Sequence, residues 1–187
     1  MDEIFESLLQ LRPFILQSAR MDSCILSTAV GCEYLSQRGI LAEPLPVQTM
    51  IFNKKFMDHA ERIGRLPVGD ELKSWSEEDG SYSVAIGMGQ QQPGKWPGHL
   101  VILAEKSYLI DLSVDQANRP QFGMVFNPIF CKISESFFSE PMIFRHADCV
   151  FRYEAKPNNL GFLSSPDWMI AGRRQKILQA FYSRDSQ

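Results

Sequence analysis

The sequence predicts an α+β fold, because segments with helical and with strand-like spacing are segregated along the chain. Apolar residues at helical spacing come first, a run of strand-like segments follows, and one helix-like segment closes the chain. Segregation of this kind favours helices packed on an antiparallel sheet over alternating strand–helix–strand units. With 187 residues the chain is large enough for one buried core, so we expect residues 1–187 to form a single domain.

Two helices are expected before the first strand. Residues 2–19 carry apolar side chains at helical spacing, although Pro13 should end or kink that helix. Asp22 and Ser23 are good N-cap residues for a second helix from about Cys24 to Arg38. Gly39 is placed to end it. This second helix is the clearest element in the sequence.

The rest of the chain is expected to be mainly strands. Alternation at 47–51 predicts a strand, residues 54–65 a short helix, and residues 66–80 a polar loop. The expected later elements are a strand in SYSVAIGM, a turn-rich link in GQQQPGKWPG, a hairpin formed by HLVILA and SYLIDL, strands in MVFNPIFCKI, MIFRH and CVFRYEA, and an amphipathic helix at 167–183.

Composition argues against several classes of partner. Hydrophobic residues make up 44% and charged residues 22%, as in an ordinary soluble protein. The net charge is −3, so we expect binding neither to nucleic acid nor to an anionic membrane, since both attract a clustered basic excess. The acidic N-terminus does not resemble a secretory signal, and no stretch approaches the roughly 20 apolar residues of a spanning helix. A cytoplasmic protein is expected.

The cysteines and histidines do not suggest a disulfide scaffold or a metal site. Four cysteines are too few for such a scaffold, and no CxxC pair occurs. The three histidines are scattered, so we expect neither a metal nor another cofactor. Cys32, Cys131 and Cys149 lie among apolar neighbours and are interpreted as small buried hydrophobes.

Cys24 falls in the first turn of the best-supported helix. Unpaired backbone N–H groups and the positive end of the helix dipole favour a negative charge there. A thiol in such a position is more easily ionised to the nucleophilic thiolate. Position alone is equally compatible with a buried structural cysteine.

His99 and Asp111 supply the other parts of a possible site. His99 opens the strand HLVILA, and an imidazole can take a thiol proton near neutral pH. If the hairpin loop has odd length and is centred on Glu105, Asp111 lies directly opposite His99 and can orient its ring. An even-length loop would put Asp111 on the other face of the sheet.

Three further residues are weaker candidates. Trp96 precedes His99 and is predicted either to wall a substrate cleft or to lie in the core. An oxyanion hole would be needed for acyl transfer, and the Cys24 backbone N–H is a natural donor. Gln17 is a second possible donor, although a polar helix-face residue is the simpler interpretation. Asp115 could replace Asp111 as the orienting acid.

Two blocks of the chain resemble a known superfamily. SCILSTAVGCEYLSQRGILAEPLPV, in the block 22–48, is similar to the cysteine segment of transglutaminase-like proteins. HLVILAEKSYLIDLSVDQ, at 99–116, is similar to their histidine-to-aspartate hairpin. The resemblance implies a papain-like (transglutaminase-like) core, with a cysteine-bearing helix packed on an antiparallel sheet. It also implies that Cys24 is the nucleophile, His99 the base and Asp111 the orienting acid.

Two functions are therefore expected as alternatives. The first is cysteine-dependent acyl transfer or amide hydrolysis, in a peptidase, amidase or acyltransferase acting on a peptide, amide or small acyl substrate. The second is a non-catalytic protein of the same fold that binds a ligand or protein partner in the same cleft. The family commonly has tryptophan beside its cysteine or after its histidine, whereas this chain has Ile25 and Leu100. This departure keeps the second function open.

Overall fold

A seven-stranded antiparallel sheet forms the centre of the protein, in a computed structural model that describes residues 2–19, 23–68, 70–77, 80–89 and 96–184. The strand order is β5-β4-β3-β1-β7-β6, and β2 pairs with β1. The strands are β1 (Ala42–Phe52), β2 (Ser83–Ile86), β3 (His99–Ala104), β4 (Tyr108–Asp111), β5 (Ile129–Lys132), β6 (Met142–His146) and β7 (Cys149–Ala155). The predicted α+β class is confirmed.

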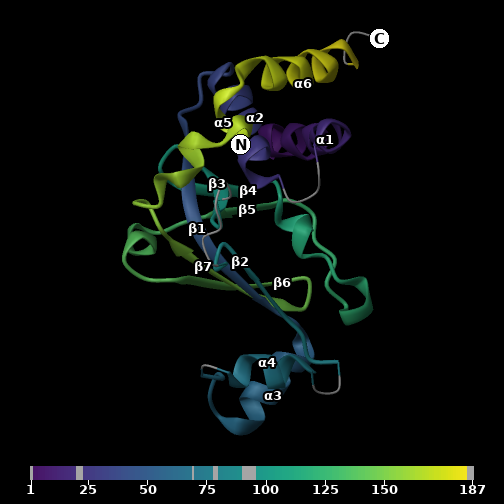
Figure 1. Ribbon diagram of the computed structural model, residues 1–187, viewed down its shortest axis with the longest axis vertical. Helices are drawn as coiled ribbons and strands as arrows, with labels where there is room; N and C mark the ends of the chain where they lie inside the picture. Colours follow the sequence, from purple (N-terminus) through teal and green to yellow (C-terminus); the bar gives the residue numbers. More distant parts are fainter. Residues whose placement is uncertain (1, 20–22, 69, 78–79, 90–95, 185–187) are drawn as a thin grey trace.

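Helices gather at two ends of this sheet (Figure 1). At one end lie α1 (Asp2–Ser18), α2 (Cys24–Ser36), α5 (Pro166–Met169) and α6 (Ala171–Arg184). At the other end lie α3 (Lys54–Ile63) and α4 (Glu71–Glu77). Short 3-10 turns η1 (Val114–Ala117), η2 (Pro120–Phe122), η3 (Glu135–Phe138) and η4 (Leu160–Ser164) join the later elements. In the described part of the chain, no helix has the length and apolar character needed to cross a membrane.

Strand β3 is buried on both faces, which explains its unbroken apolar sequence. Ile102 and Ala104 face the cluster built by α1, α2 and α6, whereas Val101 and Leu103 face a second cluster on the opposite side of the sheet. Side chains alternate between the two faces of a strand, so each cluster includes two of these four consecutive residues of β3. A polar residue at the end of this strand therefore lies deep in the protein.

Helix α2 sits very close to β3. The side chain of Thr28 donates to the carbonyl of Leu100 at 2.8 Å. Gly31 faces the side chains of Ile102 and Leu112, where an added Cβ would lie 2.4 and 2.8 Å from their terminal methyl groups. Positions 24, 28 and 31 share one face of a helix. The face that carries Cys24 is thus the face docked on the sheet.

Several boundaries differ from the sequence prediction. Helix α1 continues through Pro13, and a short helix, α4, lies within the expected loop at 66–80. The closing helix is divided at Ile170 into α5 and α6. Ser23 is the N-cap residue of α2 but its side chain does not cap the helix, and Asp22 and residues 90–95 lie outside the described residues.

Strand β1 is longer than predicted, because it begins at Ala42 and includes two prolines. Pairing with β7 starts only at Val47, so Pro44 and Pro46 lie where one side of β1 has no strand beside it. Proline lacks the backbone N–H of a ladder bond and is tolerated at such an edge.

Candidate active site

Cys24 is the first residue of α2, and its side chain is 7% exposed. The N–H groups of a first helical turn have no partner within the helix, which makes this end of α2 favourable for a negative charge. The bond from Thr28 to Leu100 fixes the helix beside the residue that follows His99. The helix start and the start of β3 are therefore held together.

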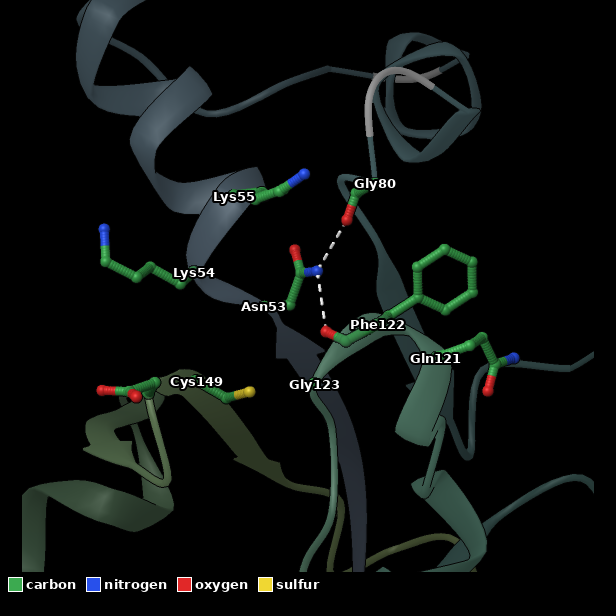
Figure 2. A pocket seen from close by; sticks show the side chains of 9 residues that line it. Asn53, Lys54, Lys55, Gly80, Gln121, Phe122, Gly123 and Cys149 are labelled. Atoms are coloured by element: carbon green, nitrogen blue, oxygen red, sulfur yellow. Dashed lines mark hydrogen bonds between the residues drawn. The ribbon is translucent and has the colours of Figure 1, made fainter.

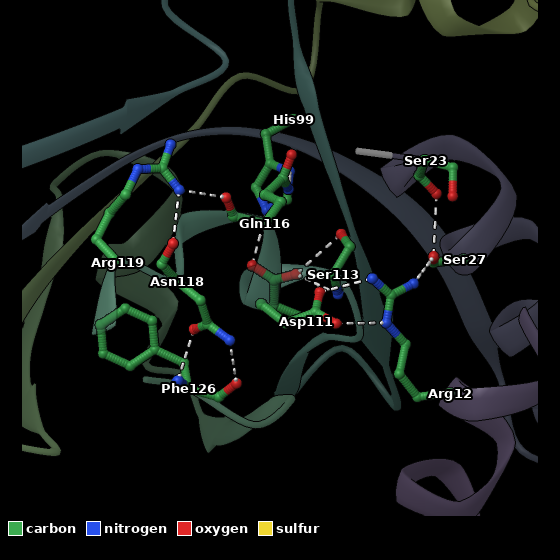
Figure 3. Close-up of polar contacts among 11 residues, drawn as sticks. Arg12, Ser23, Ser27, His99, Asp111, Ser113, Gln116, Asn118, Arg119 and Phe126 are labelled. Atoms are coloured by element: carbon green, nitrogen blue, oxygen red, sulfur yellow. Dashed lines mark hydrogen bonds and ion pairs between the residues drawn. The ribbon is translucent and has the colours of Figure 1, made fainter. Parts of the chain in front are cut away.

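His99 and Asp111 form a fully buried pair. The imidazole donates from Nε2 to Oδ2 of Asp111 at 2.7 Å, and both side chains are 0% exposed (Figure 3). The predicted register was wrong, because β3 and β4 pair Ile102 with Ile110 rather than with Tyr108. The loop has an odd number of residues, as assumed, but its centre is Lys106 rather than Glu105. Each residue of β3 is therefore paired two positions further along β4 than predicted. Because a shift by two residues does not change the face of the sheet, His99 and Asp111 still lie on one face, as diagonal neighbours.

The positions of Glu105 and Lys106 explain this shift. Both have positive φ, 50° and 53°, and the N–H of Ser107 donates to the carbonyl of Ala104. Left-handed conformations at two consecutive residues typify hairpin turns built from asparagine or glycine. Neither residue type is present here, so the sequence predicts the hairpin but gives no signal for the type of its turn.

Asp111 has a complete set of hydrogen bonds. Its Oδ1 accepts from the backbone N–H of Ser113 at 3.0 Å and from the Ser113 hydroxyl at 3.3 Å. Its Oδ2 accepts from the Tyr153 hydroxyl at 2.9 Å as well as from His99. Burial alone would raise the pKa of Asp111, but the His99 charge and these donors hold the pKa below its ordinary value. Asp111 is therefore an ionised carboxylate, and it accepts all of these hydrogen bonds.

The imidazole of His99 connects Asp111 to Cys24. Burial lowers the pKa of His99, but the charge and hydrogen bond of Asp111, followed by a hydrogen bond with Cys24, raise the pKa to about 10. Asp111 occupies Nε2, so Nδ1 is the ring nitrogen available to a thiol, and the Gln116 amide also lies near it. The structure thus brings His99 and Asp111 into direct contact, with Cys24 near enough to affect the pKa of the imidazole.

The other three cysteines have a different environment. Burial raises the pKa of Cys32 and of Cys131 to about 12 and that of Cys149 to about 11. Cys149 is buried, as predicted, while Cys32 and Cys131 are half-buried. Their thiols stay protonated near neutral pH, so none of the three is a good nucleophile.

Aromatic side chains cover the thiol. Cys24 forms a small cluster with Leu100 and Phe162, against which Trp96 and Trp168 pack. The Trp96 ring fits between two glycines: an added Cβ would lie 2.0 Å from the ring at Gly98 and 2.6 Å from it at Gly161. Its Nε1–H donates to the side chain of Asn159 at 2.8 Å. Trp96, predicted either to wall a substrate cleft or to lie in the core, thus packs against the cluster that contains Cys24.

A second layer of polar residues surrounds the triad. Arg12, 3% exposed on α1, forms a two-pronged ion pair with Asp115 and donates to the Ser27 hydroxyl at 2.7 Å. This pairing gives Asp115 a role other than orienting His99. Gln17 is exposed on α1, as expected for a polar residue on the face of a helix. Gln116, in η1, was not predicted, yet its side-chain N–H lies 3.3 Å from Nδ1 of His99.

A separate hollow of about 390 Å³ lies at the other end of the sheet, beside α3 (Figure 2). Its central polar side chain is Asn53, whose amide donates to the carbonyls of Gly80 and Phe122. The Asn53 oxygen accepts from the N–H of Phe56 and caps α3. Lys54, on the rim, pairs with Asp58. These residues are engaged in holding local structure, so the triad is the better candidate site.

Among the described residues, no group of three or more histidine, cysteine, aspartate or glutamate side chains is arranged to hold a metal ion. No protein-family model, curated protein or solved structure matches the chain.

Proposed function

We propose that this protein catalyses cysteine-dependent acyl transfer or amide hydrolysis in a papain-like or transglutaminase-like core. One observation carries the proposal: the fully buried imidazole of His99 donates to the Asp111 carboxylate at 2.7 Å, and Cys24 adds to the effect of Asp111 in raising the pKa of that imidazole. Nucleophile, base and orienting acid in this order are the parts of a catalytic triad. The order of Cys24, His99 and Asp111 along the chain also fits the proposed superfamily.

The proposed reaction starts from an ion pair in which the Cys24 proton has passed to Nδ1 of His99, and the raised pKa of His99 favours this imidazolium. The thiolate then adds to the substrate carbonyl carbon, forming a C–S bond and moving an electron pair onto the carbonyl oxygen. Collapse of this tetrahedral species breaks the bond to the leaving group, which takes the proton from His99. Water or an amine then attacks the thioester with His99 as base, the C–S bond breaks, and the proton returns to sulfur.

Asp111 supports these steps without changing its own charge. Its carboxylate stabilises the imidazolium and fixes which ring nitrogen faces the thiol. The hydrogen bonds from Ser113 and Tyr153 keep the carboxylate in place. The substrate class that suits this chemistry is an ester, thioester or amide.

A specific observation favours the second function, a non-catalytic protein that binds a partner at this site. His99 is 0% exposed and Cys24 only 7%, so a substrate reaches the sulfur only when the aromatic cover moves. A closed site of this kind is also what a buried structural triad would look like. The two functions differ in whether Cys24 reacts and turns over.

Alkylation by iodoacetamide separates the two functions, with the modified cysteine identified by mass spectrometry. For the enzyme we expect selective labelling of Cys24 at pH 6, well below the value of about 8.5 for a free thiol. His99→Ala should move this pH profile upward. Cys32→Ser is the matched control and should leave the profile unchanged.

Turnover of p-nitrophenyl acetate provides the second measurement. The wild-type protein should release more than one equivalent of p-nitrophenolate, and Cys24→Ser should release none above the background rate. Equal, slow alkylation of all four cysteines together with no turnover dependent on Cys24 would refute the enzyme and leave the binding function.

A further inference from the structure

Gln116 contacts the imidazole at the ring nitrogen that Asp111 does not occupy. Its side-chain Nε2 lies 3.3 Å from Nδ1 of His99, and Figure 3 shows the two side chains next to each other. Asp111 already occupies the other ring nitrogen, Nε2 of His99. The Gln116 amide therefore lies at the nitrogen that would exchange a proton with Cys24.

The backbone around Gln116 is held on both sides. Its N–H donates to the Ser113 carbonyl at 3.2 Å, and its own carbonyl accepts from the Arg119 guanidinium at 3.2 Å. The preceding residue, Asp115, is fixed by both prongs of the buried Arg12. A donor on such a segment needs little reorganisation before it binds a developing charge.

The contact between Gln116 and His99 depends on the protonation state of the ring. In neutral imidazole, Nε2–H donates to Asp111 and Nδ1 accepts the Gln116 N–H. Once Nδ1 has taken the thiol proton, it can no longer accept a hydrogen bond. Within the part of the chain that the structure describes, this is the only hydrogen bond found for the Gln116 side chain. Because the pKa of His99 is raised to about 10, the ring holds this second proton near neutral pH, and the Gln116 amide N–H is then available to another acceptor.

We propose that Gln116 is a further catalytic residue that donates this freed N–H to the substrate's acyl oxygen. The inference rests on the function proposed above. When the Cys24 thiolate adds to the carbonyl carbon, the C–S bond forms and the carbonyl electron pair becomes an oxyanion. The Gln116 side chain and the Cys24 backbone N–H at the start of α2 then stabilise that charge. Collapse restores the carbonyl and expels the leaving group.

Two reactions of the same thiol test this role. Alkylation by iodoacetamide displaces iodide and forms no oxyanion, whereas acylation by p-nitrophenyl acetate passes through one. In Gln116→Ala we expect the alkylation rate of Cys24 to stay within about twofold of wild type. The acylation rate should fall about 10²–10³-fold, as for other lost oxyanion donors. A residue that only orients His99 would slow both reactions by a similar factor.

Two further variants complete the experiment. Gln116→Glu keeps the shape of the side chain but replaces the donor with an acceptor, so acylation should fall at least as far as in Gln116→Ala. Gln121→Ala, at an exposed glutamine on the neighbouring turn η2, is the matched control and should change neither rate.

Each outcome bears on a definite claim. Unchanged acylation in both Gln116 variants, or equal loss of alkylation and acylation, overturns the role proposed for Gln116 while the Cys24 chemistry stands. A wild-type protein without acylation that depends on Cys24 overturns the proposed function itself, and the role of Gln116 with it. A loss confined to acylation supports both.

Discussion

Gly31 offers a direct test of how closely the cysteine-bearing helix is docked. A Cβ at this position would lie 2.4 Å from Cδ1 of Ile102 and 2.8 Å from Cδ1 of Leu112. Carbon atoms in favourable contact are about 3.5–4.0 Å apart, so α2 or both core side chains must shift by about 1 Å. Ile102 and Leu112 are buried in the core between helices and sheet and have little room to move.

The substitution Gly31→Val should therefore cost stability and reactivity together. Overpacking of a dense core typically costs about 1–3 kcal/mol. For a chain of this size, 1 kcal/mol lowers the unfolding midpoint by about 2–4 °C, so a fall of about 2–12 °C is expected. Cys24 lies seven residues earlier on the same face of the helix. Because a misplacement near 1 Å can cost up to about 10²-fold in rate, alkylation at pH 6 should slow by about tenfold or more.

Thermal melts followed by circular dichroism measure the first effect, and iodoacetamide kinetics measure the second. Gly172→Ala is the control, since a Cβ at this helical position in α6 meets no atom within 4 Å. It should leave alkylation unchanged and stabilise the protein by about 0.5–1 kcal/mol. If Gly31→Val melts and reacts like the wild type, the close contact between α2 and β3 is not what positions the thiol.

Three other predictions follow from the site. The pKa of His99 is raised from 6.5 to about 10, so its contribution to stability should be complete below pH 6.5 and lost as the pH rises toward 10. Over this range the free energy of unfolding should fall by at most about 1.4 kcal/mol per pH unit. Urea unfolding at several pH values measures this dependence, which should be weaker in Asp111→Asn. Tyr153→Phe removes a donor to a buried carboxylate and should lower the free energy of unfolding by about 1.5–3 kcal/mol, and an unchanged urea midpoint would contradict the contact. Gly161→Val should displace the Trp96 ring and speed iodoacetamide alkylation at the site, whereas slower alkylation would argue against a cover.

Strong local signals predicted the elements that carry the site. The helix starting at Cys24 was found from capping residues, apolar spacing and Gly39, and that helix does begin at Cys24. The strand at His99 was found from an unbroken apolar run, which the burial of both faces explains. Such patterns reflect the environment of each residue in its own element, so they can be recognised without knowledge of the fold.

The sequence did not predict the hairpin register or the contacts between residues far apart in the chain. The hairpin register depended on a turn whose left-handed residues, Glu105 and Lys106, are not typical turn formers. Gln116 stands in a 3-10 turn, and its link to His99 follows from the path of the chain after β4 rather than from any local pattern. The pairing of Arg12 with Asp115 joins residues 103 positions apart. Conformations and contacts of this kind are set by tertiary packing.

The energetics of the buried polar residues bear on whether the site serves stability or chemistry. His99, Asp111, Ser113 and Tyr153 are all buried, and each polar group costs free energy unless it finds a partner. Well-packed apolar residues in place of such a network are often neutral or stabilising, so the fold alone does not call for this one. The hydrogen bonds from Ser113 and Tyr153 fix Asp111, and Asp111 fixes the ring of His99. The network fixes one ring nitrogen of His99 on Asp111 and leaves Nδ1 as the nitrogen that can exchange a proton, while Cys24, at the start of a helix, contributes to the raised pKa of the same ring. This asymmetry is the physical reason for proposing a catalytic rather than a structural role.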